Sequence, residues 1–281
     1  MGPGLIATKE YDFIRKLVYD RSRINLGPDK QELVRSRLQK RLRALNLSSL
    51  DDYCRLLNGK DGDAEVTALL DAISTNFTNF FREWKHFEFL QNTLLPQWEG
   101  TSPGGPSEAL RIWSAACSSG EEPYSLAILL ADHFRRRAQP QRQAWQVFAT
   151  DISTRMLSTA NQAIYSEEKV KFPDPSWLRN YFQKGVGKWD GSYRVKSELR
   201  EHITFERLNL IESPYPFSGA FNAIFCRNVM IYFDNPTQRQ LIPQLIQHLA
   251  PKGYLFVGHS ESLLGIEHGL KCVQPSIYQR V

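Results

Sequence analysis

The sequence contains no apolar run long enough to cross a membrane. A membrane-spanning helix needs roughly 20 consecutive apolar residues, and no such run occurs among the 281 residues. The N-terminus shows no signal-peptide pattern, and residues 1–8 are typical of a disordered leader. Hydrophobic content of 42% and charged content of 23% are those of an ordinary globular protein. We therefore expect a cytoplasmic protein without direct membrane insertion.

Cysteine is scarce, and its spacing excludes two classes of site. The four cysteines, Cys54, Cys117, Cys226 and Cys272, are far apart in the chain and form no C-x-x-C pair. This spacing argues against a zinc site and against a disulfide framework. Buried apolar thiols are the expected role, and the sequence predicts no metal.

The glycine-rich nucleotide motif is also missing. In IWSAACSSGEE, residues 112–122, Gly120 is the only glycine, so G-x-G-x-x-G is absent. The apolar run, the small residues and Pro123 nevertheless predict a strand, a tight loop and a helix. Small residues at such a place also occur for tight packing alone. Glu121 and Glu122 would repel a phosphate at the helix N-terminus, which favours a cofactor with hydroxyls and a cation, such as S-adenosylmethionine.

Positive charge is concentrated near the N-terminus. The formal net charge is +5, and residues 9–45 hold eleven Lys and Arg against five Asp and Glu. Val34, Leu38, Leu42 and Leu45 recur at helical spacing and predict the packed face of a helix. The pattern indicates either a solvated face or a docking surface for an acidic partner, nucleic acid or protein helix. Four cations lie largely off the apolar stripe: Arg35, Arg37, Lys40 and Arg41.

The pattern of apolar and turn-forming residues divides the chain into two domains. Residues 9–99 are expected to form a helical domain, and 100–107, GTSPGGPS, a linker. Residues 108–281 alternate strand and helix, which predicts an α/β domain with a mostly parallel sheet. The alternation stops at about 165–203, where 185–195 resembles an antiparallel hairpin, so we expect an inserted β-subdomain or lid. The expected strands are 110–116, 145–150, 221–227 and 253–259, and the expected helices include 84–98, 121–138, 153–163 and 235–250.

Polar residues follow several of the predicted strands. Asp151 ends the second strand, where a carboxylate can hold a ribose hydroxyl pair or, alternatively, cap the next helix. Asn209 follows another strand and can donate to and accept from an adenine edge. An arginine directly after a buried strand, Arg227, is not expected for packing alone. Further polar residues at strand ends are Asn228, Tyr232, His259 and Glu261.

Five motifs in this order carry a resemblance to a known family. TNFTNFFRE, WSAACSSGEEPYSLA, FATDIS, FCRNVMIYFD and GYLFVGHSES resemble the CheR family of chemotaxis receptor methyltransferases, over residues 10–281. The resemblance implies a Rossmann-like class I methyltransferase sheet, an N-terminal all-helical domain and a small antiparallel β-subdomain insertion. It also implies methyl transfer from S-adenosylmethionine to glutamates on cytoplasmic chemoreceptor helices. The products would be glutamate 5-O-methyl esters, which tune adaptation, and S-adenosylhomocysteine.

The resemblance also assigns residues position by position. Arg82 and Tyr232 match the family residues closest to the transferred methyl group. Whether Glu121 or Glu122 contacts the cofactor stays open. Some family members bind a receptor C-terminal peptide at the inserted subdomain, which makes such a peptide a second candidate partner. The implied cofactor contacts are Asn76, Thr78, Arg82, Glu122, Asp151, Asn209, Leu210, Arg227 and Asn228.

The chemistry of a glutamate acceptor agrees with this assignment. A glutamate has a pKa of about 4.3 and is already anionic at neutral pH, so no general base is needed and none of the six histidines has to be catalytic. We expect Arg82 and Tyr232 to orient the acceptor more than they activate it. We also expect a monomer.

Two other functions remain as alternatives. Amino-methylating nucleic-acid enzymes carry an Asn/Asp-Pro-Pro-aromatic motif where this chain has Arg227-Asn228-Val229-Met230, so nucleic acid is not the expected substrate. A non-catalytic scaffold that binds S-adenosylmethionine or receptor is the other alternative, and a methyl-transfer assay separates it from an enzyme.

Overall fold

The computed structural model describes residues 8–27, 30–60, 62–100, 108–136 and 145–281. The predicted leader, apart from residue 8, and the predicted linker, apart from Gly100, lie outside these ranges. Within the described ranges, no helix combines the length and apolarity needed to span a bilayer.

The N-terminal part is helical, as expected. Buried residues between Tyr11 and Ile73 form one hydrophobic cluster. The predicted stripe contributes Val34 and Leu38, both fully buried. Ser49 caps the third helix by accepting a hydrogen bond from the Asp52 N–H. The helices are α1 (Thr8–Ser22), α2 (Gln31–Ala44), α3 (Leu50–Leu57) and α4 (Gly62–Ile73).

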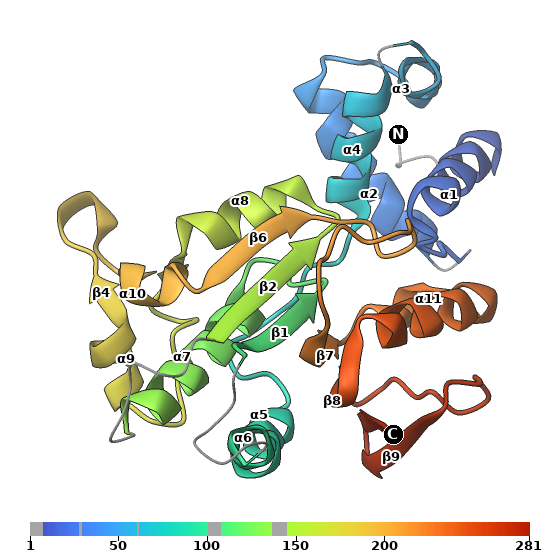
Figure 1. The fold of residues 1–281 in the computed structure, drawn as a ribbon. Coiled ribbons are helices and arrows are strands. Elements are labelled where there is room, and N and C mark those ends of the chain that lie inside the picture. The colour runs from blue at the N-terminus through green and yellow to red at the C-terminus, as the bar shows by residue number, and fades with distance from the viewer. Residues whose placement is uncertain (1–7, 28–29, 61, 101–107, 137–144) are drawn as a thin grey trace.

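The central sheet has the strand order β6-β2-β1-β7-β8-β10-β9 among the described residues. The neighbours from β6 to β8 pair in parallel, whereas β10 pairs antiparallel with β8 and β9. The predicted α/β fold with a mostly parallel sheet is therefore confirmed (Figure 1). The strands are β1 (Leu110–Ala115), β2 (Trp145–Asp151), β6 (Ile203–Arg207), β7 (Phe221–Cys226), β8 (Leu249–Val257), β9 (Leu270–Gln274) and β10 (Ile277–Arg280).

Helices cover both faces of this sheet because successive strand residues point to opposite sides. Ile112 and Phe225 belong to one hydrophobic cluster, together with residues of helix α7 (Glu121–Arg135). Their neighbours Trp113 and Ile224 belong to a second cluster. That second cluster includes Leu241, Ile242 and Leu245 of helix α11 (Asn235–Gln247).

The helix predicted for 84–98 packs against the sheet and not against the N-terminal helices. It runs from α5 (Lys85–Phe89) through a π-helical turn, η2 (Leu90–Leu94), into α6 (Leu95–Glu99). Its apolar side chains belong to the same cluster as α7. The limits 9–99 for a helical domain stay a prediction, and the packing favours an end nearer residue 74.

The predicted β-subdomain is present as a separate antiparallel sheet. Its strands β3 (Ile164–Ser166), β4 (Phe182–Lys184) and β5 (Ser192–Val195) lie in the order β3-β5-β4. Lys184 lies opposite Tyr193, so the expected antiparallel hairpin is present, but its first strand lies at 182–184, before the predicted range 185–195. The insertion also holds the short helices α9 (Ser176–Tyr181) and α10 (Ser197–Arg200).

The N-terminal helices sit over the carboxyl ends of the parallel strands. In Figure 1 the arrows of β6, β2 and β1 point toward α2 and α4. The Tyr19 hydroxyl donates to Asp234 at 2.7 Å, and the Asn25 N–H donates to the Tyr232 carbonyl at 2.8 Å. Near helix α8 (Thr154–Gln162), the Thr154 hydroxyl donates to Asp71. These contacts hold the N-terminal helices over the carboxyl ends of the parallel strands, which is where ligands of such folds bind.

Candidate active site

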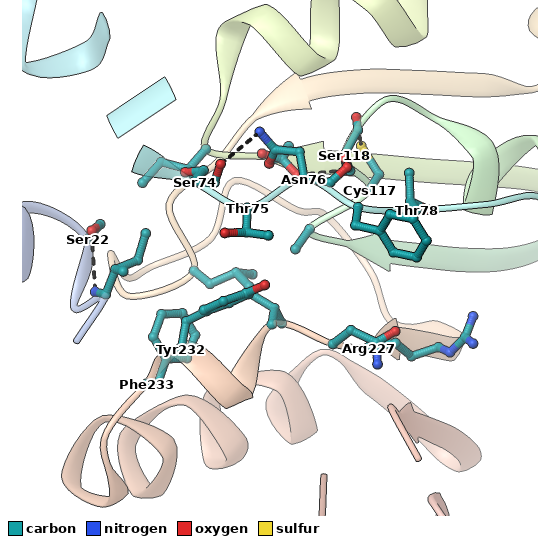
Figure 2. A pocket seen from close by; sticks show the side chains of 18 of the residues that line it. Ser22, Ser74, Thr75, Asn76, Thr78, Cys117, Ser118, Arg227, Tyr232 and Phe233 are labelled. Atoms are coloured by element: carbon teal, nitrogen blue, oxygen red, sulfur yellow. Dashed lines mark hydrogen bonds between the residues drawn. The ribbon is translucent and has the colours of Figure 1, made fainter. Parts of the chain in front are cut away.

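A pocket lies at the carboxyl ends of β1, β2 and β7, beneath the segment 73–79. Figure 2 shows Asn76 and Ser118 on one side of it and Tyr232 on the other, with the Tyr232 ring directed into the cavity. All residues predicted as catalytic or cofactor-binding line this one pocket: Asn76, Thr78, Arg82, Glu122, Asp151, Asn209, Leu210, Arg227, Asn228 and Tyr232.

The loop between β1 and α7 makes an unusually tight turn. Ala116, Ser118 and Gly120 all have positive φ angles, of 66°, 50° and 94°. A Cβ atom on Gly120 would lie 2.8 Å from both the Ala160 Cβ and the Tyr165 hydroxyl. Only glycine satisfies both the conformation and the close approach of α8. The single glycine of the motif therefore shapes the loop.

The two consecutive glutamates at the start of α7 have different surroundings. Glu121 is fully buried and accepts from Lys169 at 2.5 Å and from Ser119 at 2.6 Å. Glu122 accepts from the Ser114 hydroxyl at 2.7 Å and from Arg227 at 2.9 Å, and it lines the pocket. Burial raises the pKa of Glu122, although Arg227 and Ser114 oppose that rise. Of the two, Glu122 is the one that faces the pocket.

Asp151 ends β2 with both carboxylate oxygens directed at the backbone. Oδ2 accepts the Ser118 N–H at 2.8 Å, and Oδ1 accepts the Ser153 N–H at 2.9 Å. Burial raises the pKa of Asp151, and these hydrogen bonds lower it. Helix α8 is capped by the Ser153 side chain, which accepts from the Met156 N–H. Asp151 is thus not the cap, and its remaining lone pairs can accept hydroxyl donors.

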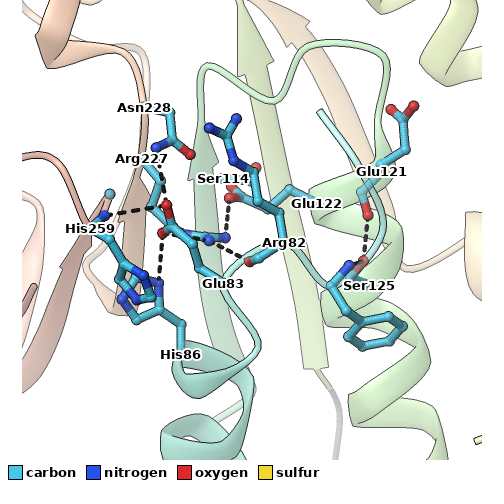
Figure 3. Close-up of polar contacts among 12 residues, drawn as sticks. Arg82, Glu83, His86, Ser114, Glu121, Glu122, Ser125, Arg227, Asn228 and His259 are labelled. Atoms are coloured by element: carbon cyan, nitrogen blue, oxygen red, sulfur yellow. Dashed lines mark hydrogen bonds and ion pairs between the residues drawn. The ribbon is translucent and has the colours of Figure 1, made fainter. Parts of the chain in front are cut away.

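Arg227 joins three parts of the site. Its side chain is only 2% exposed. One nitrogen donates to Glu122 at 2.9 Å, and the other donates to Glu83 at 2.8 Å and to the Arg82 carbonyl (Figure 3). Burial alone would raise the pKa of Glu83, but the hydrogen bonds and charge of Arg227, with further donors, lower it to about 2. Glu83 is therefore a charged partner of Arg227 at neutral pH.

The turn that carries Asn228 and Tyr232 is fixed by Glu261. This buried carboxylate accepts the N–H groups of Gly258 at 2.6 Å, Asn228 at 2.8 Å and Ile231 at 3.2 Å. Burial raises the pKa of Glu261, and the three amides lower it. Asn228 itself has a positive φ of 57°. Glu261 stabilises the conformation that directs Tyr232 toward the pocket.

Arg82 approaches the pocket beside an exposed aromatic ring. Its Nη1 donates to the Phe77 carbonyl at 3.0 Å, and its guanidinium lies 5.6 Å from the centre of the Phe77 ring. The Phe77 side chain is 69% exposed. Arg82 and Tyr232 therefore reach the same cavity from segments 150 residues apart.

The sequence profile described as "CheR methyltransferase, SAM binding domain" matches residues 76–278, and that of the "CheR methyltransferase, all-alpha domain" matches residues 9–74. The chain belongs to the CheR methyltransferase family. A chemotaxis protein methyltransferase of Escherichia coli K12 is 40% identical over 265 residues, which cover 94% of this chain and 88% of that protein. One of Salmonella typhimurium is 42% identical over 249 residues, covering 89% and 82%. One of Borreliella burgdorferi is 36% identical over 275 residues, covering 98% and 95%.

S-adenosylmethionine is the cofactor of this CheR family domain. The residues that line the pocket are chemically suited to S-adenosylmethionine. Asp151 and Glu122 bring two carboxylates to a cavity whose wall also includes the apolar side chains of Leu210 and Phe233. Carboxylates can accept hydroxyl donors and favour a cation, and apolar walls suit an adenine face. The acidic helix start is thus consistent with a cationic ligand and not with a phosphate.

Asn209 and Leu210 lie on the pocket wall next to the N-terminal helices. The Asn209 amide donates to the Arg21 carbonyl of α1 and to Glu212, both at 2.9 Å. Its side chain therefore also holds the end of α1 against the sheet. Leu210 is buried, and its carbonyl accepts from the Tyr215 hydroxyl.

The predicted docking cations of α2 have unequal surroundings. Arg41 makes two hydrogen bonds to Glu65, at 2.9 and 2.5 Å, and Glu65 also accepts from the Tyr53 hydroxyl. Arg37 donates to the Ala72 carbonyl at the end of α4. Both are tied into the helical core, whereas Lys40 is exposed. Arg35, which pairs with Glu32, is half-buried.

Glu83 and Ser125 are among the site residues to which the sequence assigned no role. Glu83 pairs with Arg227, and Ser125, fully buried in α7, accepts the Phe81 N–H at 2.9 Å. Glu83 stands in the quoted motif TNFTNFFRE, so its position next to Arg82 was the available signal. Ser125 lies three residues after Glu122 in a helix with an amphipathic pattern. That pattern does not distinguish a serine that accepts a backbone hydrogen bond from a small residue that only packs.

Proposed function

We propose that this CheR family protein methylates glutamate side chains on the cytoplasmic helices of a chemoreceptor, forming glutamate 5-O-methyl esters that tune adaptation. The observation that carries the proposal is the convergence of Arg82 and Tyr232 with Glu122 and Asp151 on one pocket. Curated relatives with 36–42% identity, described as chemotaxis protein methyltransferases, support a receptor as the substrate.

The pocket has the chemistry that a carboxylate acceptor requires. S-adenosylmethionine, when bound, supplies a methyl carbon that carries a sulfonium leaving group. A glutamate acceptor is already anionic near neutral pH, so the protein does not have to remove a proton. All six histidines lie in the described ranges, and none of them lines the pocket. This agrees with a reaction that depends on orientation and partial desolvation.

We assign the pocket residues to two tasks. Asp151 and Glu122, with Asn209, would bind the cofactor through its hydroxyls, its cationic part and its base. Arg82 and Tyr232 would orient the acceptor carboxylate, the first through charge-assisted hydrogen bonds and the second through its hydroxyl. Tight binding of the acceptor carboxylate in the ground state would slow methyl transfer, so we expect these side chains to orient the carboxylate more than they activate it. The remaining proposed cofactor contacts are Asn76, Thr78, Leu210, Arg227 and Asn228.

Helix α2 is the proposed docking surface for the acidic receptor helix. Lys30 and Leu33, at the start of α2, line the rim of the pocket. Lys40 is exposed about two turns beyond Leu33 on the same helix. A glutamate-bearing helix laid along α2 would therefore bring its carboxylates toward the pocket mouth.

The β-subdomain is a second proposed contact, for a receptor C-terminal peptide. In the described three-stranded sheet, β4 lies at one edge. An extended peptide can add to such an edge through backbone hydrogen bonds.

Calorimetry and a transfer assay together test the proposed function. We expect micromolar binding of S-adenosylhomocysteine by the wild type and its loss in Asp151→Ala, while Asp190→Ala, at an exposed hairpin position, binds normally. Incubation of receptor with methyl-labelled cofactor should yield label that alkali releases as methanol, as an ester requires. Binding without transfer would favour the scaffold alternative, and alkali-stable label would exclude a glutamate ester.

A further inference from the structure

The backbone around Arg82 has an uncommon conformation. Phe81 and Glu83, the residues on either side of Arg82, have φ angles of 54° and 58°. Residues other than glycine seldom adopt the left-handed region, and bulky aromatic residues least of all. Two such residues flanking one arginine persist only where the surroundings hold them. The chain therefore needs anchors on both sides of Arg82.

The first anchor holds Phe81. Its N–H donates to the Ser125 hydroxyl oxygen at 2.9 Å, and that hydroxyl donates to the Glu121 carbonyl at 2.6 Å. Ser125 is fully buried in the first turns of α7. The residue before Arg82 is thus fixed to the helix that begins at the cofactor loop.

The second anchor holds Arg82 and Glu83 together. Arg227 donates through the same nitrogen to the Arg82 carbonyl and to the Glu83 carboxylate. Glu83 Oε1 accepts from the Asn228 side chain at 3.1 Å and from the His259 N–H at 3.3 Å. The Glu83 side chain is 12% exposed, so these contacts lie away from bulk water. One carboxylate joins the turn of Arg82 to the loops after β7 and β8.

A metal ion is a poor alternative occupant for this cluster. Glu83, His86 and His259 bring ligand atoms within 4.8 Å of one another. However, Arg227 lies 2.8 Å from Glu83, and both carboxylate oxygens already accept hydrogen bonds. A second cation beside a buried guanidinium would be repelled.

We propose that Glu83 is a positioning residue for Arg82. By holding Arg227 against the Arg82 carbonyl (Figure 3), its carboxylate fixes the left-handed turn. This turn directs the Arg82 guanidinium toward Phe77 and the pocket. The proposal rests on the proposed function, in which Arg82 orients the acceptor. Glu83 itself does not line the pocket, whereas Arg82, Arg227 and Asn228 do.

Steady-state kinetics on receptor test this role. Glu83→Gln removes the charge and keeps the shape, and we expect a kcat at least tenfold lower with the affinity for S-adenosylhomocysteine within threefold of wild type. Glu83→Asp, which keeps the charge on a shorter chain, should recover part of that kcat. Glu88→Gln, at an exposed glutamate of helix α5 just after this turn, serves as the matched control and should be unchanged. Wild-type kcat in Glu83→Gln, or a parallel loss of folding or cofactor affinity, would overturn the proposal.

A double-mutant cycle tests whether Glu83 affects kcat by positioning Arg82 or independently of Arg82. If Glu83 acts through Arg82, Glu83→Gln should lower kcat by less than twofold when introduced into Arg82→Ala. A full additional tenfold loss would contradict action through Arg82.

A crystal structure of Glu83→Gln gives a readout that needs no activity. We expect the Arg82 carbonyl to leave Arg227 and the guanidinium to leave the Phe77 ring. An unchanged turn would overturn the proposal even if wild-type protein methylates no receptor. Absence of receptor methylation by wild type would instead overturn the proposed function.

Discussion

Arg227 donates to Glu122 at 2.9 Å from a side chain that is almost completely buried. The same guanidinium pairs with Glu83, so one cation contacts two carboxylates. Removal of one member of a buried ion pair typically costs about 3–5 kcal/mol because the other charge stays buried and unpaired. Arg227 is therefore expected to stabilise the folded site as well as to contact the cofactor.

We predict that Arg227→Met lowers the free energy of unfolding by about 3–5 kcal/mol. Arg227→Lys should lose less, since it keeps the charge but cannot donate to both carboxylates in a fork. Urea denaturation at pH 7 measures both, and Arg239→Met, at an exposed position of α11, is the control. A midpoint for Arg227→Met equal to that of the control would contradict the role of this ion pair.

A second prediction concerns the turn at Gly120. Alanine there has an unfavourable φ of 94° and a Cβ only 2.8 Å from Ala160 and Tyr165. We expect Gly120→Ala to destabilise the protein by about 2–4 kcal/mol, the sum of left-handed strain and overpacking, and to weaken cofactor binding. Gly187→Ala, at φ 61° with no atom within 4 Å, has strain alone and should cost only about 1 kcal/mol. Equal losses in the two variants would show that the close approach of α8 is unimportant.

The pattern of apolar and polar residues predicted the fold and the pocket residues at strand ends, whereas Asn76, Thr78, Arg82 and Leu210 were predicted only by the family resemblance. Asp151 ends β2 and Arg227 directly follows β7, and parallel strands bring their carboxyl ends to one edge of the sheet. The sequence could not decide between Glu121 and Glu122, because consecutive helical residues point about 100° apart and only the packed orientation of α7 selects one. Lys169, the partner of Glu121, belongs to the inserted segment and is 48 residues away.

The roles of Glu83 and Arg41 also could not be predicted from the local sequence pattern. Glu83 depends on Arg227, 144 residues later, and on backbone angles that no side-chain pattern encodes. The amphipathic stripe of α2 correctly placed Val34 and Leu38 in the core. It could not show that Arg41 would meet Glu65 of α4, because helix–helix contacts depend on how the helices pack.

A third prediction follows from His86. This side chain is 1% exposed, and both ring nitrogens lack a hydrogen-bond partner among the described residues. Burial is the main cause that lowers the pKa of His86 from 6.5 to about 3. The positive charge of Arg227 lowers this pKa further and His259 has a smaller effect, whereas the charge of Glu83 opposes the shift. The unfolded chain therefore binds a proton below pH 6.5 that the folded protein does not bind. The contribution of His86 to stability falls by about 1.4 kcal/mol per pH unit as the pH drops below 6.5.

His86→Phe should remove this pH dependence and the two ring nitrogens that make no hydrogen bond to any described residue. We expect the difference in unfolding free energy between variant and wild type to grow by about 2 kcal/mol in favour of the variant from pH 8 to pH 5. Chemical denaturation at both pH values measures it. The same pH slope in both proteins would mean that His86 is protonated in the folded state.

The last prediction separates docking from folding on α2. Lys40 is exposed, so Lys40→Glu should raise the apparent KM for receptor several-fold through charge repulsion, with unchanged cofactor affinity and melting temperature. Arg41→Glu instead puts a second carboxylate beside the buried Glu65 and removes a bidentate pair. We expect it to lower the free energy of unfolding by about 3 kcal/mol or more, so a higher KM in that variant would not report docking.

Salt and a matched charge reversal complete this test. Lys271→Glu, at an exposed position on β9 at the far edge of the sheet from β6, makes the same change in net charge and should leave KM unchanged. Because exposed charges are screened within roughly 10 Å at 0.1 M salt, the KM difference between Lys40→Glu and wild type should shrink as salt is raised. A KM for Lys40→Glu equal to that of Lys271→Glu at low salt would place the receptor elsewhere than on α2.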